Sequence, residues 1–208
     1  MNLLTPRPGY WLTPLIIYLN TGIFLLVALM TQSILWFPAR ELIILGGNFG
    51  PLTVEGQWWR LLSSVFLHGG LLHLVFNAIV LANIGIFLEP LLGRVSFAAV
   101  YLTTGILASL TSLVFNFGVV SVGASGAIFG MYGFFVALLT TNLFKPEFRN
   151  TFLRNTLGFI VLNIAIGFFG PIDNAAHIGG LVSGFILGFV WLPAIRKRVI
   201  RKRGVRFD

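Results

Sequence analysis

The sequence predicts an all-α membrane protein, and three observations support that prediction. Hydrophobic residues make up 57% of the 208 residues and charged residues only 10%, whereas soluble domains carry roughly 25% charged residues. The mean hydropathy is +0.93. Several apolar runs are long enough to cross a bilayer, which takes about 20 apolar residues in a helix. We therefore expect one transmembrane domain over residues 1–208, with a short N-terminal segment 1–10 and a basic tail 196–208.

Six spans can be placed between the charged and helix-breaking segments. The first is the uncharged stretch from Trp11 to Trp36, which has aromatic residues near its ends as interface anchors. The other five lie at about 71–88, 95–115, 124–143, 155–169 and 174–192. The fifth is short for a full crossing unless the bilayer thins locally. The sequence therefore predicts a six-transmembrane-helix bundle.

The first loop, from Phe37 to Arg60, differs in composition from the spans around it. Glycines and prolines break it up, and the pair Gly46-Gly47 ends its apolar run far short of a span. Because Trp58 and Trp59 follow, we expect this loop to lie at the membrane interface. A second loop, residues 88–94, is expected to form a short polar turn.

The basic residues predict the orientation of the chain. If both termini are cytoplasmic, that side holds twelve of the fourteen Lys and Arg residues, and only Arg40 and Arg60 lie outside. Seven of the twelve lie in the tail 196–208. A basic tail can bind nucleic acid, but directly after a span it is more typical of the cytoplasmic side and of contact with anionic lipid. The chain has no cysteine, which excludes disulfides and thiolate nucleophiles.

Two polar side chains lie at the same predicted depth in different spans. Ser125 lies between glycines at the outer end of the fourth span, and His177 follows 52 residues later at the outer end of the sixth. Each adjoins a stripe of glycines at four-residue spacing, which lets helices approach closely. The stripes are Gly126 and Gly130 on one span and Gly180, Gly184 and Gly188 on the other. If the stripes face each other, the histidine can activate the serine as a nucleophile.

Further polar residues could complete a catalytic site. His73 and Asn77 are four positions apart, so they share a helix face, and they could donate to an oxyanion together with backbone N–H groups of the first turn beside Ser125. Phe129 could hold the imidazole of His177 by packing. Asp173 is not clearly placed to orient His177, so the pattern predicts a Ser–His dyad. Interhelical hydrogen bonding is the alternative role for the histidines.

These motifs together resemble the rhomboid family of intramembrane serine proteases. The resemblance rests on Trp59-Arg60, the spacing of His68, His73 and Asn77, and the segments around Ser125 and His177, and it covers roughly residues 55–190. It implies Ser125 as nucleophile and His177 as base. It also implies an oxyanion hole of His73, Asn77 and the Ser125 amide, and a loop at Gly123 that approaches the substrate. The Trp59-Arg60 pair and Glu89 match positions with structural roles.

The resemblance also implies the setting of the reaction. The substrates would be single-pass transmembrane proteins, cleaved in or beside their membrane segment, with no cofactor, metal or nucleic acid involved. A compact six-span form implies a multi-pass protein of a bacterial plasma membrane. Phe129 departs from the family, where many bacterial members have tyrosine; stacking on the histidine survives, but a hydroxyl contact is lost.

Other functions fit the sequence less well. A catalytically inactive relative that binds transmembrane segments would need the fold but not the set of Ser125, His177, His73 and Asn77. A transporter or channel would favour inverted repeats or charges within spans, and neither occurs. A metalloprotease could use the three histidines, but the sequence contains no His-Glu-x-x-His motif.

Overall fold

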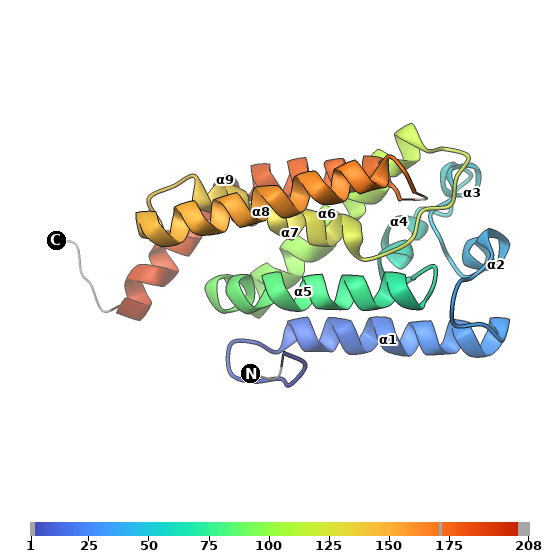
Figure 1. Ribbon diagram of the computed structural model, residues 1–208, viewed down its shortest axis with the longest axis horizontal. Helices are drawn as coiled ribbons and strands as arrows, with labels where there is room; N and C mark the ends of the chain where they lie inside the picture. Colours follow the sequence, from blue (N-terminus) through green and yellow to red (C-terminus); the bar gives the residue numbers. More distant parts are fainter. Residues whose placement is uncertain (1–2, 171, 204–208) are drawn as a thin grey trace.

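A computed structural model describes residues 3–170 and 172–203 of the chain, and this part consists of helices joined by loops (Figure 1). β-Pairing among the described residues is confined to two isolated bridges, Arg7 with Tyr10 and Asn48 with Ser121. The longer helices are α1 (Leu12–Thr31), α5 (Leu71–Leu92), α6 (Arg94–Phe115), α7 (Ser125–Leu139), α8 (Pro146–Gly167) and α9 (Asn174–Arg203). Four short helices, α2 (Ala39–Ile44), α3 (Gly50–Val54), α4 (Arg60–Ser63) and the 3₁₀ helix η1 (Ser64–Phe66), follow α1.

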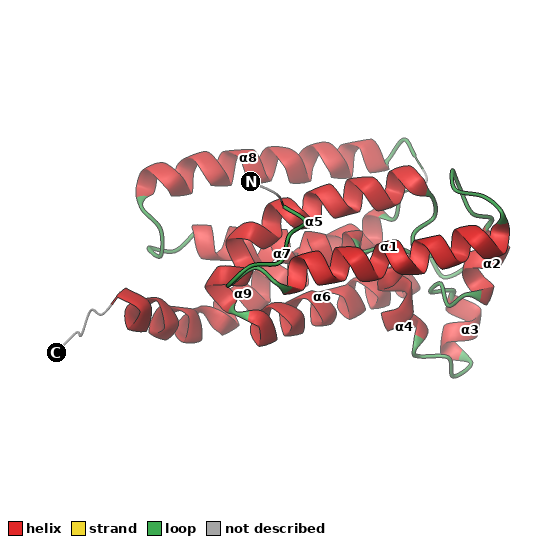
Figure 2. Ribbon diagram, turned by 90° about the horizontal axis from the view of Figure 1, so that it is seen from below, coloured by secondary structure: helices red, strands yellow, loops and turns green. Residues whose placement is uncertain are grey.

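The long helices lie roughly along one direction, with distinct ends to the bundle. Figures 1 and 2 show α1 beside α5, and α2 to α4 gathered at the end where α1 finishes. The start of α1 and the end of α9 lie at the opposite end (Figure 2). Residues 204–208 of the predicted basic tail lie outside the described residues. The bundle therefore has one end covered by the short helices α2 to α4 and an opposite end where α1 begins and α9 finishes.

The helical membrane architecture is confirmed, and four of the six predicted spans qualify by length and composition. These four are α1, α5, α6 and residues 174–200 of α9. Helix α7 has only 15 residues, and twelve of them are buried, so the other helices surround it. Helix α8 has 22 residues but carries charge in its first turns. Both helices therefore differ from a typical lipid-facing span.

Three helices extend beyond the spans predicted for them. The polar turn predicted at 88–94 was wrong, because α5 continues through Glu89 and Pro90 to Leu92 and only Gly93 separates it from α6. Helix α8, which holds the fifth predicted span, begins at Pro146, since a proline at the first position and Glu147 in the first turn favour a helix start despite their polarity. Helix α9, which holds the sixth, continues beyond residue 192 to Arg203.

Glu89 is buried, and its carboxylate caps the start of another helix, α1. Its carboxylate accepts hydrogen bonds from the backbone N–H groups of Trp11, Leu12 and Thr13 and from the Thr13 hydroxyl. These backbone groups have no partner within α1, and the helix dipole favours negative charge at that position. The predicted polar turn at 88–94 is therefore a helix junction whose carboxylate is fully used inside the protein.

Arg60 holds the first loop together. Its guanidinium donates to the carbonyl oxygens of Ile43 and Gly47, at 2.6 and 2.9 Å, and to the Gln57 side chain at 2.7 Å. It also lies over the Trp59 ring, 4.8 Å from the ring centroid. Since Arg60 itself is buried, these bonds compensate the loss of its hydration. The loop is thus an ordered part of the fold.

The glycine stripes of α7 and α9 face each other, as the sequence predicts. A Cβ atom placed on Gly180 would overlap the carbonyl oxygen of Gly126, and one on Gly184 would overlap that of Gly130. Gly188 continues the contact against Ala137. Backbone therefore packs directly on backbone, which only residues without side chains allow.

Replacing Gly180 by alanine should destabilise the protein strongly. Overpacking a core typically costs about 1–3 kcal/mol, and the atom in the way at Gly180 is a backbone oxygen that cannot rotate aside. Gly158→Ala is the matched control, because a Cβ on Gly158 of α8 meets nothing within 4 Å. In detergent, the melting temperature should fall strongly for Gly180→Ala and stay unchanged for Gly158→Ala. Equal melting temperatures would contradict the backbone contact.

Candidate active site

Ser125 is the first residue of α7, and an ordered loop leads into it. Asn48 and Ser121 exchange two backbone hydrogen bonds, and the N–H of Gly123 donates to the carbonyl of Ser64 at 2.9 Å. Gly123 has φ of +125°, a conformation that favours glycine. The first loop and η1 therefore fix the backbone immediately before the serine.

His73 lies directly against this backbone. A Cβ on Gly123 would be 2.7 Å from Nε2 of His73 and 3.7 Å from Oγ of Ser125, so the glycine brings the two side chains to the same place. The Nδ1 atom of His73 accepts a 3.3 Å hydrogen bond from the N–H of Gly69. In the neutral ring the proton is then on Nε2. His73 thus presents a donor beside Gly123 and Ser125.

His177 is buried in the first turn and a half of α9 and stacks on Phe129. The two ring centroids are 4.1 Å apart and the rings are nearly parallel, at 5°, which confirms the predicted packing. Phe129 is four residues after Ser125, so both lie on the same face of α7. The neighbouring backbone also meets, since a Cβ on Gly126 would lie 3.7 Å from the carbonyl oxygen of Ala176. The structure therefore places the imidazole over the face of α7 that carries Ser125.

Asn77 is buried one turn after His73 on α5. Its amide donates to the carbonyl of His73 at 2.8 Å, which uses one of its two N–H groups. The hydrogen bonds found among the described residues join Asn77 to its own helix and not to Ser125 or His177. Of the two side chains predicted to stabilise an oxyanion, His73 is the one that the structure brings to Gly123.

Asp173, which the sequence left without a clear role, is a hydrogen-bonding centre. Its carboxylate accepts from the Ser112 hydroxyl, from the Asn116 amide at 2.8 Å and from the N–H of Ala176 at 2.9 Å. The carbonyl of Asp173 accepts from the N–H of His177 at 3.1 Å. It therefore caps α9 and joins it to the end of α6. Meanwhile Nδ1 of His177 is buried, and no carboxylate of the described residues accepts a hydrogen bond from it.

His68 lies behind His73, with ring centroids 5.2 Å apart in an edge-to-face arrangement. It is almost fully buried, and neither of its ring nitrogens has a hydrogen-bond partner. Burial, reinforced by the nearby His73, lowers the pKa of His68 to about 3. The side chain is therefore neutral at physiological pH and cannot act there as a charged acid.

Sequence reasoning missed a small polar cavity beside Ser125. Its volume is about 10 Å³, close to what one water molecule requires. The hydroxyl oxygens of Ser64 and Ser109, two of its lining residues, are 3.3 Å apart. Other lining residues include Gly105, Ser121, Gly123, Asp173 and Ala176. The buried serines Ser64 and Ser109, each in an otherwise apolar stretch, were the signal that could have revealed the cavity.

Comparison with known proteins gives one consistent family. The family model for the rhomboid domain matches residues 55–194. "RHOMBOID-like protein 5" of Arabidopsis thaliana is 46% identical over 143 residues, covering 68% of this chain and 46% of that protein. "Rhomboid protease GluP" of Bacillus subtilis (strain 168) is 38% identical over 166 residues, 77% of this chain and 32% of that protein. "Rhomboid-like protease 1" of Toxoplasma gondii is 33% identical over 169 residues, 79% of this chain and 58% of that protein.

The apolar helices and the polar site buried at one end of their bundle define an integral membrane protein. The chain belongs to the rhomboid family, since the family model covers more than half of it. It spans a third to just over half of the length of the three relatives named above.

Asp173→Ala should lower both stability and the ordering of His177. It removes three hydrogen bonds and the cap of α9, and loss of such a cap alone costs about 0.5–2 kcal/mol. Asp173→Asn is the matched variant, because an amide oxygen can still accept and the Ser112 hydroxyl can reverse to accept from the new N–H. Melting temperatures should fall clearly for Asp173→Ala and little for Asp173→Asn. If both fall equally, the negative charge and not the hydrogen bonding is what stabilises α9.

Proposed function

We propose that this protein is an intramembrane serine endopeptidase that uses Ser125 as nucleophile and His177 as general base. The observation that carries the proposal is the stacking of His177 on Phe129, one helical turn from Ser125 and at the end of the bundle where His73 meets Gly123. The names of the Bacillus subtilis and Toxoplasma gondii relatives, both called proteases, support the same activity.

The reaction follows from the roles of the two side chains. Oγ of Ser125 attacks the carbonyl carbon of the scissile peptide bond while the imidazole of His177 takes its proton. The tetrahedral intermediate collapses, the C–N bond breaks, and the imidazolium gives the proton to the leaving amine. Water then attacks the acyl-enzyme, with His177 again as base, and releases the acid product and free Ser125. No cofactor or metal is needed for these steps.

The negative oxygen of the intermediate needs donors already in place. The first N–H groups of α7 have no intrahelical partner, and the helix dipole favours an anion beside them. The Nε2–H of His73 is directed to the same gap, because Gly69 donates to the other ring nitrogen. We assign the second N–H of Asn77 a lesser part, since its first is used within α5.

We further propose that α7 and α8 complete six spans. Because α7 is enclosed by protein, its length of about 22 Å need not match a hydrocarbon core of about 30 Å. The distribution of Lys and Arg favours cytoplasmic termini, which puts Ser125 near the outer surface. Substrates are then single-pass transmembrane proteins that enter from the bilayer, and a bacterial plasma membrane suits so compact a domain.

Ser125→Ala and His177→Ala should each abolish cleavage of a reporter transmembrane substrate, because each removes one member of the dyad. Labelling by a fluorophosphonate should occur in the wild type, map to Ser125 and be lost in both variants. Chelators should leave cleavage and labelling unchanged.

Ser121→Ala is the matched control for the dyad, since this serine lines the same cavity four residues earlier; it should keep both labelling and activity. If the folded wild-type protein neither reacts with the fluorophosphonate nor cleaves the substrate, the proposed protease activity is wrong. The alternative function, a rhomboid-like binder of transmembrane segments, would then take its place. Cleavage that survives in Ser125→Ala would refute the dyad itself.

His73→Ala should slow the chemical step more than Asn77→Ala does. Loss of one oxyanion donor in a soluble serine protease costs roughly a hundred- to thousand-fold in rate, and we expect a loss approaching that range for His73 and a smaller one for Asn77. Since the charge exists only in the transition state, the deficit should appear in kcat more than in KM. A different result would assign these residues to helix packing: in both variants the melting temperature falls in step with activity, while kcat of the folded fraction is unchanged.

A further inference from the structure

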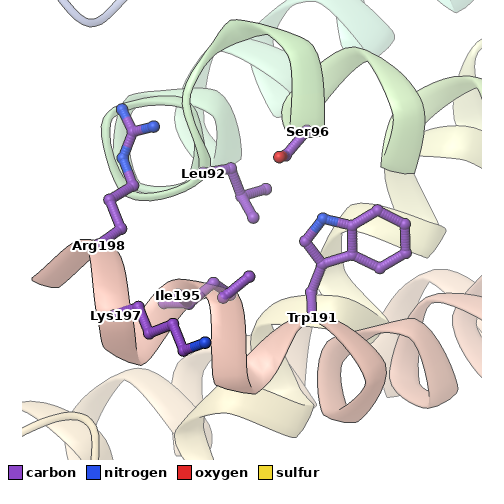
Figure 3. Close-up of a pocket in the computed structure, with 7 residues that line it drawn as sticks. Leu92, Ser96, Trp191, Ile195, Lys197 and Arg198 are labelled. Atoms are coloured by element: carbon purple, nitrogen blue, oxygen red, sulfur yellow. The ribbon is translucent and has the colours of Figure 1, made fainter.

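A second cavity lies far from Ser125, at the end of the bundle where α9 finishes. It has a volume of about 380 Å³ and lies between the last turns of α9 and the junction of α5 with α6 (Figure 3). Its lining residues are Leu92, Ser96, Trp191, Ala194, Ile195, Lys197 and Arg198. A cavity of this size is within the range of small-ligand sites, roughly 300–1,000 Å³.

The cationic part of this cavity comes from α9. Arg198 lies against the α5–α6 junction, because a Cβ on Gly93 would overlap its guanidinium. The Nε of Arg198 is buried, yet no described residue accepts a hydrogen bond from it. Glu89, the acidic residue of the neighbouring helix end, is fully used by four donors at the start of α1. The cavity therefore combines Lys197 with a guanidinium whose Nε–H is left unpaired among the described residues.

The rest of the lining is amphipathic in a way that fits a lipid. Leu92 and Ile195 are buried and apolar, while the hydroxyl of Ser96 faces the same opening (Figure 3). Trp191 lines the cavity, and Trp11 lies at this end of the bundle beneath the guanidinium of Arg94, 5.3 Å from its ring centroid. Tryptophan and arginine at the ends of spans are typical of the headgroup level of a bilayer.

We propose that this cavity binds a phosphate group, with Lys197 and Arg198 pairing with its oxygens and Ser96 donating a hydrogen bond. Guanidinium groups bind phosphate bidentately, and basic pockets between transmembrane helices bind anionic lipid headgroups. The phosphate can come from an anionic phospholipid or from solution; the apolar residues Leu92 and Ile195 favour the lipid, whose first acyl methylenes they would cover. This site does not depend on the chemistry at Ser125.

The test is titration of purified full-length protein in neutral detergent with short-chain phosphatidylglycerol, followed by native mass spectrometry. Lys197→Gln and Arg198→Gln should each weaken binding by roughly fivefold, the effect of one basic residue at a lipid surface. Arg196→Gln is the matched control, since Arg196 is an exposed neighbour on α9 that does not line the cavity. Phosphatidylcholine should bind to all four proteins equally weakly.

A second variant separates a cavity from diffuse charge attraction. Ala194→Phe fills the cavity from an exposed position without changing charge, and should reduce phosphatidylglycerol binding at least as much as Arg198→Gln at an unchanged melting temperature. Displacement of the lipid by millimolar inorganic phosphate would assign the site to a soluble phosphate. Equal losses for Arg196→Gln and Arg198→Gln, with full binding by Ala194→Phe, would overturn the site.

Discussion

The close approach of α7 and α9 determines the geometry of the rest of the molecule. In a bilayer, helices gain little from hiding apolar surface from one another, so packing and polar contacts must hold them. Here Gly180 lies on the carbonyl of Gly126, and Gly184 on that of Gly130. Ser125 directly precedes one of these glycines, and His177 lies three residues before another. The register of the glycine contact is therefore also the register of the candidate catalytic pair.

The polar groups around that pair fall into two sets. Asp173 and Asn77 have their hydrogen bonds within the protein: Asp173 joins the end of α6 to the start of α9, and Asn77 donates within α5. His177, by contrast, keeps Nδ1 without a partner, and the stacked ring of Phe129 holds its plane. In a triad a carboxylate would orient that nitrogen. Here the ring of His177 stacks on Phe129 instead, and such packing would give the proposed dyad a defined ring position without a carboxylate.

Features with a short-range pattern could be predicted from the sequence, and those with distant partners could not. The glycine stripes and the packing of Phe129 on His177 follow from helical spacing, whereas the resemblance alone implied that His73 and Gly123 belong to one site. Glu89 was read as part of a turn because its partners, the N–H groups of α1, lie more than seventy residues away. Asp173 was missed for the same reason, since Ser112 and Asn116 belong to another helix.

Helix α9 connects the two polar ends of the protein and sets the depth of the site. His177 and Arg198 are 21 residues apart, which is about 32 Å along a helix, close to the hydrocarbon thickness of about 30 Å. If Arg198 is anchored at the headgroups of one leaflet, an upright α9 carries His177 about 2 Å beyond the opposite boundary. At the average tilt of membrane helices, about 20°, the projected length falls to about 30 Å, so His177 lies at that boundary. The candidate site around Ser125 would then lie at the depth of the outer headgroups, within reach of interfacial water.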